Sequence, residues 1–399
     1  MLVIISSFVP VKLWKYLKNK NGDLSKLFTG IILIVALIFM VGTFVSYAAE
    51  TTITAKNIVP SSYNQQWQKA MFWVSGNTPE NSIFVHWWDY GYWVQTLGER
   101  PTVTDGGHAN AWWDYTTARY LLTNQKPETA LSLMKTYNVS YLLIDSTDLG
   151  KYTAYSSIGS DGNGDRFSQI PVMVVDPSQT IESAGKEARI YQGSTIVDED
   201  MVYSDKNGSN IFLPANKAFV IGMIIEIAKT NGSLSFKQPQ AVFFYNNQQV
   251  RIPLRYLYYK GEIIDFKDGI EATARIMQGA TLSGQSSVSV DELGSVIYLS
   301  PKVSKGLFAQ LYLMDDPSNN YKTLIVAHSE PDPFVASLRA QGLNLDEIVY
   351  FQGFRGPIKI WKIGYPDNIL KKDEFLYPPG GWDTINGPWA TLDDLKVIA

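Results

Sequence analysis

With 399 residues, 45% of them apolar and 18% charged, the chain is long enough to form about two or three hydrophobic cores. Its formal net charge of −4 argues against a nucleic-acid-binding protein, which would present a basic patch. Because the sequence contains no cysteine, disulfides, thiol catalysis and cysteine-ligated zinc are excluded.

The N-terminal part predicts a membrane anchor. Residues 27–49 carry no charge and reach the roughly 20 apolar residues that a helix needs to cross a bilayer. Lysines precede this segment, so the positive-inside rule places the N-terminus in the cytoplasm and everything after residue 50 outside the cell membrane. A signal peptide would have a shorter apolar core, which favours a retained helix. Residues 1–26 are interpreted as the end of a preceding span followed by a cytoplasmic basic loop; a disordered or interfacial start is the alternative.

Residues 50–169 predict an α/β domain. Apolar residues at helical spacing indicate a helix that includes Trp67 and ends at Gly76, before a strand at 83–85. A second helix begins at Pro127 and leads into a strand at 141–144. Two helix–strand units in series suggest one sheet, and ligands gather at the carboxyl ends of the strands of such a sheet.

The rest of the chain divides into a β-rich subdomain and a C-terminal segment. Residues 170–300 show short β-like runs separated by Gly, Asn and Ser, at 172–175, 218–227, 241–245 and 256–259. Residues 301–399 predict a helix near 307–313, a strand at 324–327, a helix after Pro333, an alternating strand at 358–363 and an irregular tail. The predicted fold is a mixed α+β or α/β extracytoplasmic domain with a β-rich subdomain, preceded by one transmembrane helix.

Several short motifs carry little weight. Asp198-Glu199-Asp200 has the spacing of a metal-binding tripeptide, but such tripeptides are common on solvated loops. The loop 161–165 has oxygen-bearing residues at calcium-loop spacing, but it lacks the glycine and glutamate that follow in such a loop. His86, His108 and His328 are too far apart in the sequence to predict a zinc pair or a catalytic triad.

Three Asn-X-Ser sequons follow the predicted span, at Asn138, Asn207 and Asn231. Asn138 lies between a predicted helix and a predicted strand and is expected to be shielded. The other two lie in Asn-Gly-Ser turns and are plausible modification sites.

The strand at 83–85 runs directly into Trp87-Trp88-Asp89-Tyr90-Gly91, which places two indoles, a carboxylate and a phenol at the rim of a core. A core edge capped by an aspartate is the structural alternative. Trp112-Trp113-Asp114-Tyr115 repeats the pattern without its glycine and is interpreted as coincidence.

The pentapeptide resembles the WWDYG signature of oligosaccharyltransferase catalytic subunits, the enzymes of Asn-linked protein glycosylation. GYWVQTLGERPTVTDGG follows it here, and Asp148-Leu149-Gly150-Lys151 is similar to the DK motif of the archaeal and eukaryotic members. That motif has Met or Ile four residues after its lysine, where Tyr155 stands in this chain; whether Tyr155 or Ile158 completes the motif stays open. The archaeal, dolichyl-phosphate-dependent branch fits best, and the chain corresponds to the C-terminal portion of such a glycotransferase.

The resemblance implies that the seven motif residues bind substrate: Trp87, Trp88, Asp89, Tyr90, Gly91, Asp148 and Lys151. The tryptophans and Asp89 would hold the hydroxyl of an acceptor Asn-X-Ser/Thr, Gly91 would let the backbone turn closely, and Lys151 would line the same pocket. The residue types suit this role, because a carboxylate accepts from a hydroxyl while an indole N–H donates to it. An acceptor without the hydroxyl would leave these groups unpaired, at a cost of about 1–3 kcal/mol.

The resemblance also implies what lies elsewhere. Family members carry a multi-span domain that binds a divalent metal, Mg or Mn, and the lipid-linked oligosaccharide. No catalytic residue and no metal ligand can therefore be assigned to this chain, which should transfer nothing alone. The expected partners are an acceptor polypeptide, the lipid-linked oligosaccharide through the missing domain, and the membrane, with no nucleic acid. The alternative function is that of a membrane-anchored glycan-binding or cell-envelope ectodomain.

Overall fold

A computed structural model describes residues 11–12, 15, 22–57, 63–183, 186–204, 208, 210–230, 233–283 and 287–378. The chain separates into two compact units, Met1–Asn64 and Gln65–Ala399. The predicted preceding span at 1–9, the sequons at Asn207 and Asn231 and the end of the tail lie outside the described residues.

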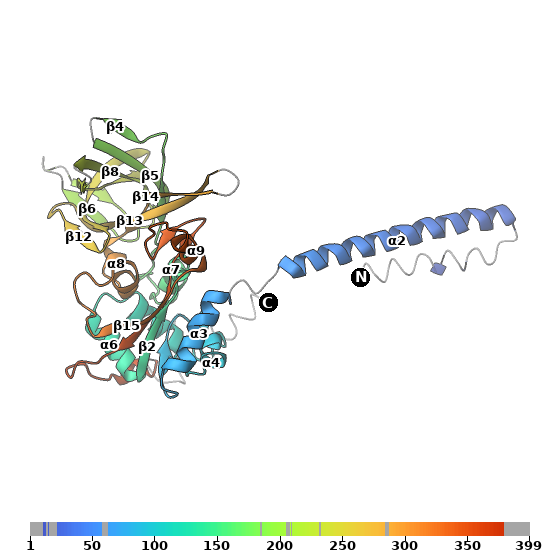
Figure 1. The fold of residues 1–399 in the computed structure, drawn as a ribbon, viewed down its shortest axis with the longest axis horizontal. Coiled ribbons are helices and arrows are strands. Elements are labelled where there is room, and N and C mark those ends of the chain that lie inside the picture. The colour runs from blue at the N-terminus through green and yellow to red at the C-terminus, as the bar shows by residue number, and fades with distance from the viewer. Residues whose placement is uncertain are drawn as a thin grey trace. The chain divides into compact units, whose positions relative to one another are not determined.

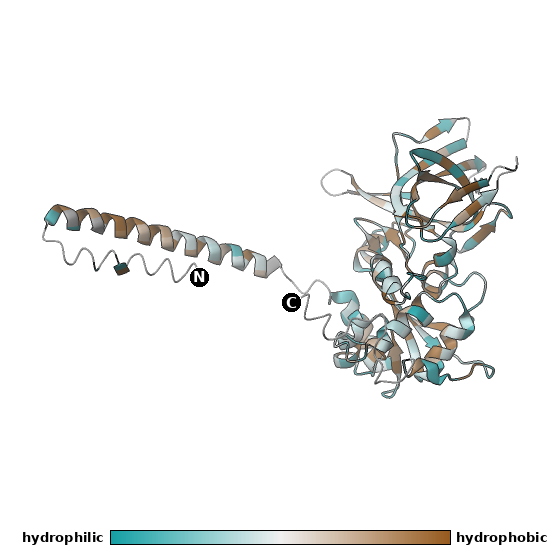
Figure 2. Cartoon of the chain, turned by 180° about the vertical axis from the view of Figure 1, so that it is seen from behind, coloured by the Kyte–Doolittle hydropathy of each residue, from teal (hydrophilic) through white to brown (hydrophobic). Residues whose placement is uncertain are grey.

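The first unit contains the helix α2, Asp23–Asn57. Its segment Lys26–Ala55 is long and apolar enough to cross a membrane, and Figure 2 shows the apolar colouring along it. Leucine, isoleucine, valine and phenylalanine side chains along α2 are exposed in the described part of this unit. Within the described residues, the prediction of one apolar N-terminal helix is confirmed.

The second unit consists of two parts, a four-stranded sheet with helices around it and a β-barrel, which are called here the first and the second layer (Figure 1). Its helices and helical turns are α3 Gln65–Asn77, η1 Trp88–Tyr90, α4 Gly91–Thr96, α5 Ala111–Thr117, η2 Ala118–Leu122, α6 Pro127–Thr136, α7 Asp148–Ile158, α8 Pro301–Ser304, η3 Ala309–Leu313, α9 Pro333–Ala340 and η4 Asp373–Phe375. Its strands are β1 Ile83–Val85, β2 Val139–Ile144, β3 Val172–Val175, β4 Ile181–Ser183, β5 Lys186–Ile196, β6 Met201–Ser204, β7 Asn210–Leu213, β8 Phe219–Thr230, β9 Ser233–Phe236, β10 Gln240–Tyr245, β11 Gln248–Tyr259, β12 Glu262–Asp265, β13 Ile270–Ser283, β14 Ser287–Leu299, β15 Leu324–Glu330, β16 Val349–Tyr350, β17 Phe354–Arg355 and β18 Ile358–Ile363.

The first layer is a four-stranded sheet in the order β1-β2-β18-β15. β1 and β2 are parallel, with Phe84 opposite Tyr141, while β18 runs antiparallel to both of its neighbours. α3 begins the domain and buries Trp67 and Met71, as its helical spacing predicts. Because β1 and β2 are parallel, the polar clusters that follow them emerge at the same edge of the sheet.

The second layer is a β-barrel. A path of strands runs β11-β10-β8-β5-β3-β14-β13, and an additional parallel pairing of β11 with β13 closes it. Closure satisfies the backbone groups that an open sheet would leave at its edges. Apolar side chains fill the interior, among them Tyr191, Met223 and Phe243. The predicted fold class, a mixed α and β domain with a β-rich subdomain, is confirmed.

The sequence analysis did not predict β13 and β14, the longest hairpin of the barrel. β13 is buried on both faces and carries polar Thr273, Arg275 and Gln278 among its apolar residues. A strand buried on both sides does not alternate between apolar and polar residues, so the period that reveals a half-exposed strand is absent.

Candidate functional site

The WWDYG motif lies immediately after β1. The chain leaves the sheet at Val85 and turns through the short 3-10 helix η1 into α4, which begins at Gly91. On the neighbouring strand, β2 ends at Ile144 and α7 begins at Asp148, so the DK-like element starts at the same sheet edge. The parallel pairing of two short strands therefore brings together two motifs that are about sixty residues apart.

Lys151 joins the two motifs through its ammonium group. Its Nζ lies 2.8 Å from Asp89 Oδ2 and donates to the Tyr90 hydroxyl oxygen at 2.9 Å. The Tyr90 hydroxyl in turn donates to Asp148 Oδ1 at 2.8 Å. The side chains of Asp89 and Lys151 are 26% and 31% exposed, whereas Tyr90 and Asp148 are buried. The network thus runs from a buried base to an accessible carboxylate.

Asp148, the buried carboxyl of this network, is oriented by a backbone hydrogen bond, and burial shifts its pKa. Asp148 Oδ2 accepts from the backbone N–H of Asp145 at 3.0 Å. Burial raises the pKa of Asp148 to about 7, although the nearby Lys151 charge acts in the opposite direction. Burial, and after it the charge of Asp148, also raises the pKa of the Tyr90 hydroxyl well above its usual value. Tyr90 therefore stays a neutral hydrogen-bond donor at physiological pH.

The two tryptophans of the motif occupy different environments. Trp87 is buried and packs against Tyr155 with 5.3 Å between ring centroids. Trp88 is half-buried, and its indole Nε1 is buried without a hydrogen-bond partner among the described residues. A buried N–H donor without an acceptor is costly, so Trp88 Nε1 is a donor that a hydrogen-bond acceptor would stabilise.

His108 packs against Trp88 and is itself held by Asp114. The His108 ring meets the Trp88 ring edge-on, 4.3 Å between centroids, and its Nδ1 lies 2.8 Å from Asp114 Oδ2. Asp114 belongs to the WWDY repeat at 112–115. The interpretation of that repeat as coincidence missed this neighbour of the site. The signal that could have found it is the DGGH sequence, which turns the chain back toward the motif.

Gly91 is required by close packing. Its φ of −55° is an ordinary helical value, so the expected role in a tight backbone turn is not what demands glycine here. A Cβ at this position would lie 2.4 Å from Asp105 Cβ and 2.6 Å from the carbonyl oxygen of Thr104. The segment that carries Asp105 therefore passes directly over the start of α4, and the motif's glycine makes room for it.

The two candidates for the hydrophobic end of the DK-like motif differ in burial. Tyr155 is fully buried, and its hydroxyl donates to the carbonyl oxygen of Asp148 at 3.3 Å. Ile158 is 41% exposed at the end of α7. Ile158 follows Lys151 by seven residues and so lies on the same helix face, where an incoming ligand could reach it.

The other motifs have partners within the chain. Asp198 Oδ2 accepts from the hydroxyls of Ser168 and Ser300, both at 2.5 Å, and Asp165 forms an ion pair with Arg119. No group of three or more His, Asp or Glu side chains within the described ranges is arranged to hold a metal ion. Asn138, expected to be shielded, is exposed with a φ of +54°, because it forms the turn that leads into β2.

The remaining histidines take structural positions. Burial lowers the pKa of His86 to about 4, and its Nδ1 lies 2.7 Å from the carbonyl oxygen of Trp87. His328 stacks on Trp73, 4.6 Å between ring centroids, and pairs with Glu330 at 3.2 Å.

Comparisons with known proteins point to one family. Residues 80–163 match the family model described as the STT3/PglB/AglB core domain. The dolichyl-phosphooligosaccharide-protein glycotransferase 1 of Pyrococcus furiosus is 32% identical over 118 residues, 28% of this chain and 12% of that protein. The STT3B subunit of the Oryza sativa dolichyl-diphosphooligosaccharide–protein glycosyltransferase is 30% identical over 91 residues, 23% of this chain and 12% of that protein. The matched region makes up 12% of the length of each relative, so the chain corresponds to only a small part of either protein.

Solved structures are similar over a larger share of the chain. The Archaeoglobus fulgidus oligosaccharyltransferase AglB, in complex with an inhibitory peptide and a dolichol-phosphate, has a TM-score of 0.39 and 14% identity and covers 85% of this chain and 31% of that chain. The Campylobacter jejuni PglB C-terminal domain has a TM-score of 0.37 and 11% identity and covers 74% of this chain and 99% of that chain. Residues 80–163 of the chain therefore carry the STT3/PglB/AglB core domain, and the archaeal relatives that share sequence with the chain are oligosaccharyltransferases.

Proposed function

We propose that this chain is the C-terminal, acceptor-recognising part of an oligosaccharyltransferase, and that it binds the Ser/Thr hydroxyl of an Asn-X-Ser/Thr sequon at Asp89 and Trp88. The observation that carries this proposal is the pairing of a partly exposed carboxylate with a buried, unpartnered indole N–H in one motif. A hydroxyl can donate to the first group and accept from the second.

Lys151 gives the carboxylate its orientation. Lys151 Nζ contacts one oxygen of Asp89 and also the Tyr90 hydroxyl, so the Lys151 side chain is fixed at two points. A carboxylate offers about four lone-pair directions, and its contact with Lys151 leaves capacity for a ligand hydroxyl. Ile158, exposed on the same face of α7, supplies an apolar surface for the methyl group of a threonine.

The names of the relatives support a proposal for the activity of the whole enzyme. A dolichyl-phosphooligosaccharide-protein glycotransferase moves an oligosaccharide from a lipid carrier to protein. For this chain we propose the same reaction as part of a longer enzyme, whose multi-span domain would hold the lipid-linked oligosaccharide, the divalent metal and the catalytic groups. The helix Lys26–Ala55 would cross the membrane, with the second unit on the extracytoplasmic side.

A peptide titration tests the proposal. The purified chain is titrated with an Asn-X-Thr peptide, with the Asn-X-Ala and Gln-X-Thr peptides, and with free glycans. Loss of the hydroxyl should weaken binding about 5- to 150-fold, the equivalent of about 1–3 kcal/mol for leaving polar partners unpaired. Asp89→Asn should abolish this discrimination, while Asp200→Asn, at a carboxylate outside the site, should leave it intact.

Two outcomes contradict the proposal. Equal affinity for the Thr and Ala peptides would show that no hydroxyl is recognised. A preference for free glycans with no response to the peptide would instead support the alternative of a membrane-anchored glycan-binding module.

A further inference from the structure

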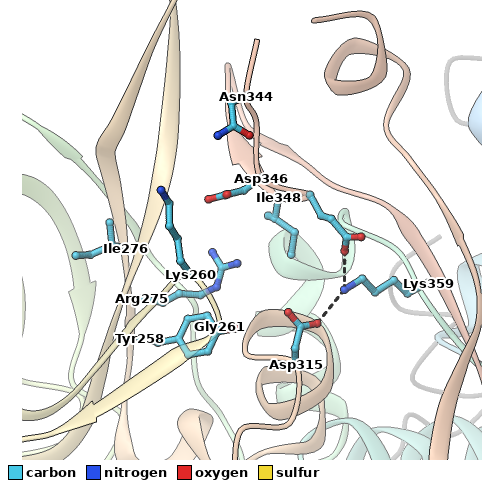
Figure 3. Close-up of a pocket in the computed structure, with 11 residues that line it drawn as sticks. Tyr258, Lys260, Gly261, Arg275, Ile276, Asp315, Asn344, Asp346, Ile348 and Lys359 are labelled. Atoms are coloured by element: carbon cyan, nitrogen blue, oxygen red, sulfur yellow. Dashed lines mark hydrogen bonds and ion pairs between the residues drawn. The ribbon is translucent and has the colours of Figure 1, made fainter. Parts of the chain in front are cut away.

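A polar cavity lies between the β-barrel and the C-terminal part of the second unit, on elements other than those of the WWDYG site. Its volume is about 440 Å³, within the range of small-molecule sites. Lys260 and Arg275 reach it from the barrel, while Asp315 follows η3, Asp346 precedes β16 and Lys359 belongs to β18 (Figure 3). Glu347, next to Asp346, also lines the cavity. The cavity is therefore lined by three cationic and three anionic side chains.

Most of these charges are paired within the protein. Lys359 Nζ lies 3.0 Å from Asp315 Oδ1 and 2.8 Å from Glu347 Oε2, the two contacts drawn in Figure 3. Lys260 forms an ion pair with Glu292 at the surface of the barrel. These pairs occupy two of the cations and two of the carboxylates.

Arg275 and Asp346 are the exceptions. Arg275 is only 8% exposed, its Nε donates to the carbonyl oxygen of Leu313, and its Nη1 is buried without a hydrogen-bond partner among the described residues. In the described part of the chain, neither Arg275 nor Asp346 lies within 4 Å of an oppositely charged group. The guanidinium also lies over the Tyr258 ring, 5.7 Å from its centroid. A buried guanidinium that contacts no carboxylate is unfavourable, and an anionic ligand in the cavity would supply that contact.

We propose that this cavity binds a monoanionic, polyhydroxylated ligand, of which a hexuronic acid residue is the simplest sugar. Its carboxylate would pair with Arg275, and a ring hydroxyl would donate to Asp346. Both of the unpaired side chains are then satisfied by one molecule.

The balance of charge selects this class of ligand. Because Lys260 and Lys359 are already paired within the protein, Arg275 is the cation that remains to balance a ligand, and it balances one negative charge. The second charge of a phosphate or sulfate would face the unpaired Asp346 without a counter-charge. A neutral sugar could satisfy Asp346 but would leave Arg275 without an anion. A single carboxylate on a ring of hydroxyls meets both requirements, since an arginine fork matches a carboxylate and carboxylate side chains accept from hydroxyls.

Binding to the full chain tests this inference. The chain is titrated by calorimetry with glucuronate, glucose and inorganic sulfate at constant ionic strength. Glucuronate should bind saturably and at least about tenfold more tightly than glucose or sulfate. Saturation by glucose or sulfate at the glucuronate concentration, or no saturable binding of glucuronate, overturns the inference.

Variants locate the site. Arg275→Gln should remove glucuronate binding, and the matched control Arg255→Gln, on the neighbouring strand β11 and paired with Asp265, should not. Because Arg275 is buried and its loss can unfold the barrel, the exposed rim residue Asn344 offers a second variant, Asn344→Trp, which should block the cavity without entering the core. Glucuronate binding that survives Asn344→Trp, or that falls equally in Arg255→Gln, refutes the assignment. The inference does not rest on sequon recognition, so unchanged peptide binding in these variants is expected.

Discussion

Replacing Gly91 with alanine adds one methyl group at the centre of the proposed acceptor site. The new Cβ would lie 2.4 Å from Asp105 Cβ, 2.5 Å from its Cα and 2.6 Å from the carbonyl oxygen of Thr104. Non-bonded carbons prefer separations of about 3.5–4.0 Å, so the 104–105 segment must move by about 1 Å. Overpacking of this kind costs about 1–3 kcal/mol of unfolding free energy, because the obstructing atoms are mostly backbone and cannot rotate away.

The matched control is Gly150→Ala, at the glycine of the DK-like motif. No atom lies within 4 Å of a Cβ at position 150, and the residue is in the first turns of α7. Alanine is the better helix former by about 0.5–1 kcal/mol, so this variant should be neutral or more stable. Thermal unfolding followed by circular dichroism should therefore place Gly91→Ala a few degrees below the wild type and Gly150→Ala at or above it.

The same movement should weaken acceptor recognition. The Thr104 hydroxyl donates to the carbonyl oxygen of His86 at 3.0 Å, and this bond holds the 104–105 segment against the WWDYG turn. The affinity for an Asn-X-Thr peptide should fall in Gly91→Ala and remain near the wild-type value in Gly150→Ala. Identical melting temperatures for the two variants would refute the claim that close packing is what demands glycine at position 91.

Three further predictions concern the charged groups of the site. Lys151→Met removes a partly exposed partner of Asp89, worth about 0.2–1 kcal/mol, so peptide titration should show a Kd raised about 1.4- to 5-fold, with Lys151→Arg less affected. The pKa of Asp148 is raised to about 7 in the folded state, so between about pH 4 and pH 7 the folded state holds a proton that the unfolded state has lost. The stability that this carboxyl contributes should therefore fall as pH rises through that window. Asp148→Asn should remove this part of the pH dependence of the melting temperature. A constant difference in melting temperature between the wild type and Asp148→Asn across this pH range would contradict the prediction. His108→Gln should weaken peptide binding while moving the melting temperature by less than about 2 °C, since His108 is 43% exposed yet contacts the Trp88 ring; a large loss of stability with intact binding would show a structural role instead.

The local pattern of the sequence was sufficient for α3 and for three strands of the small sheet. The buried residues of α3 recur at the helical spacing that predicts it, and β1, β2 and β18, which are mostly buried, were predicted from short runs rich in apolar residues. The barrel strands β13 and β14 were not predicted, because buried polar side chains such as Thr273, Arg275 and Ser295 interrupt their apolar runs. Where a strand is covered on both faces, its sequence does not alternate between apolar and polar residues, and periodicity gives no signal.

For the candidate site, the sequence alone supplied the motif and its residue types. The two helix–strand units that it predicted in one sheet were enough to expect polar clusters at the carboxyl ends of the strands. Only the tertiary structure decided the chemistry between them: which aspartate Lys151 meets, that Tyr90 connects it to a buried Asp148, and that His108 packs on Trp88. The same holds for the cavity at Arg275, whose members are up to about a hundred residues apart. Contacts of this kind depend on the distance between groups in space, and a linear pattern records distance only along the chain.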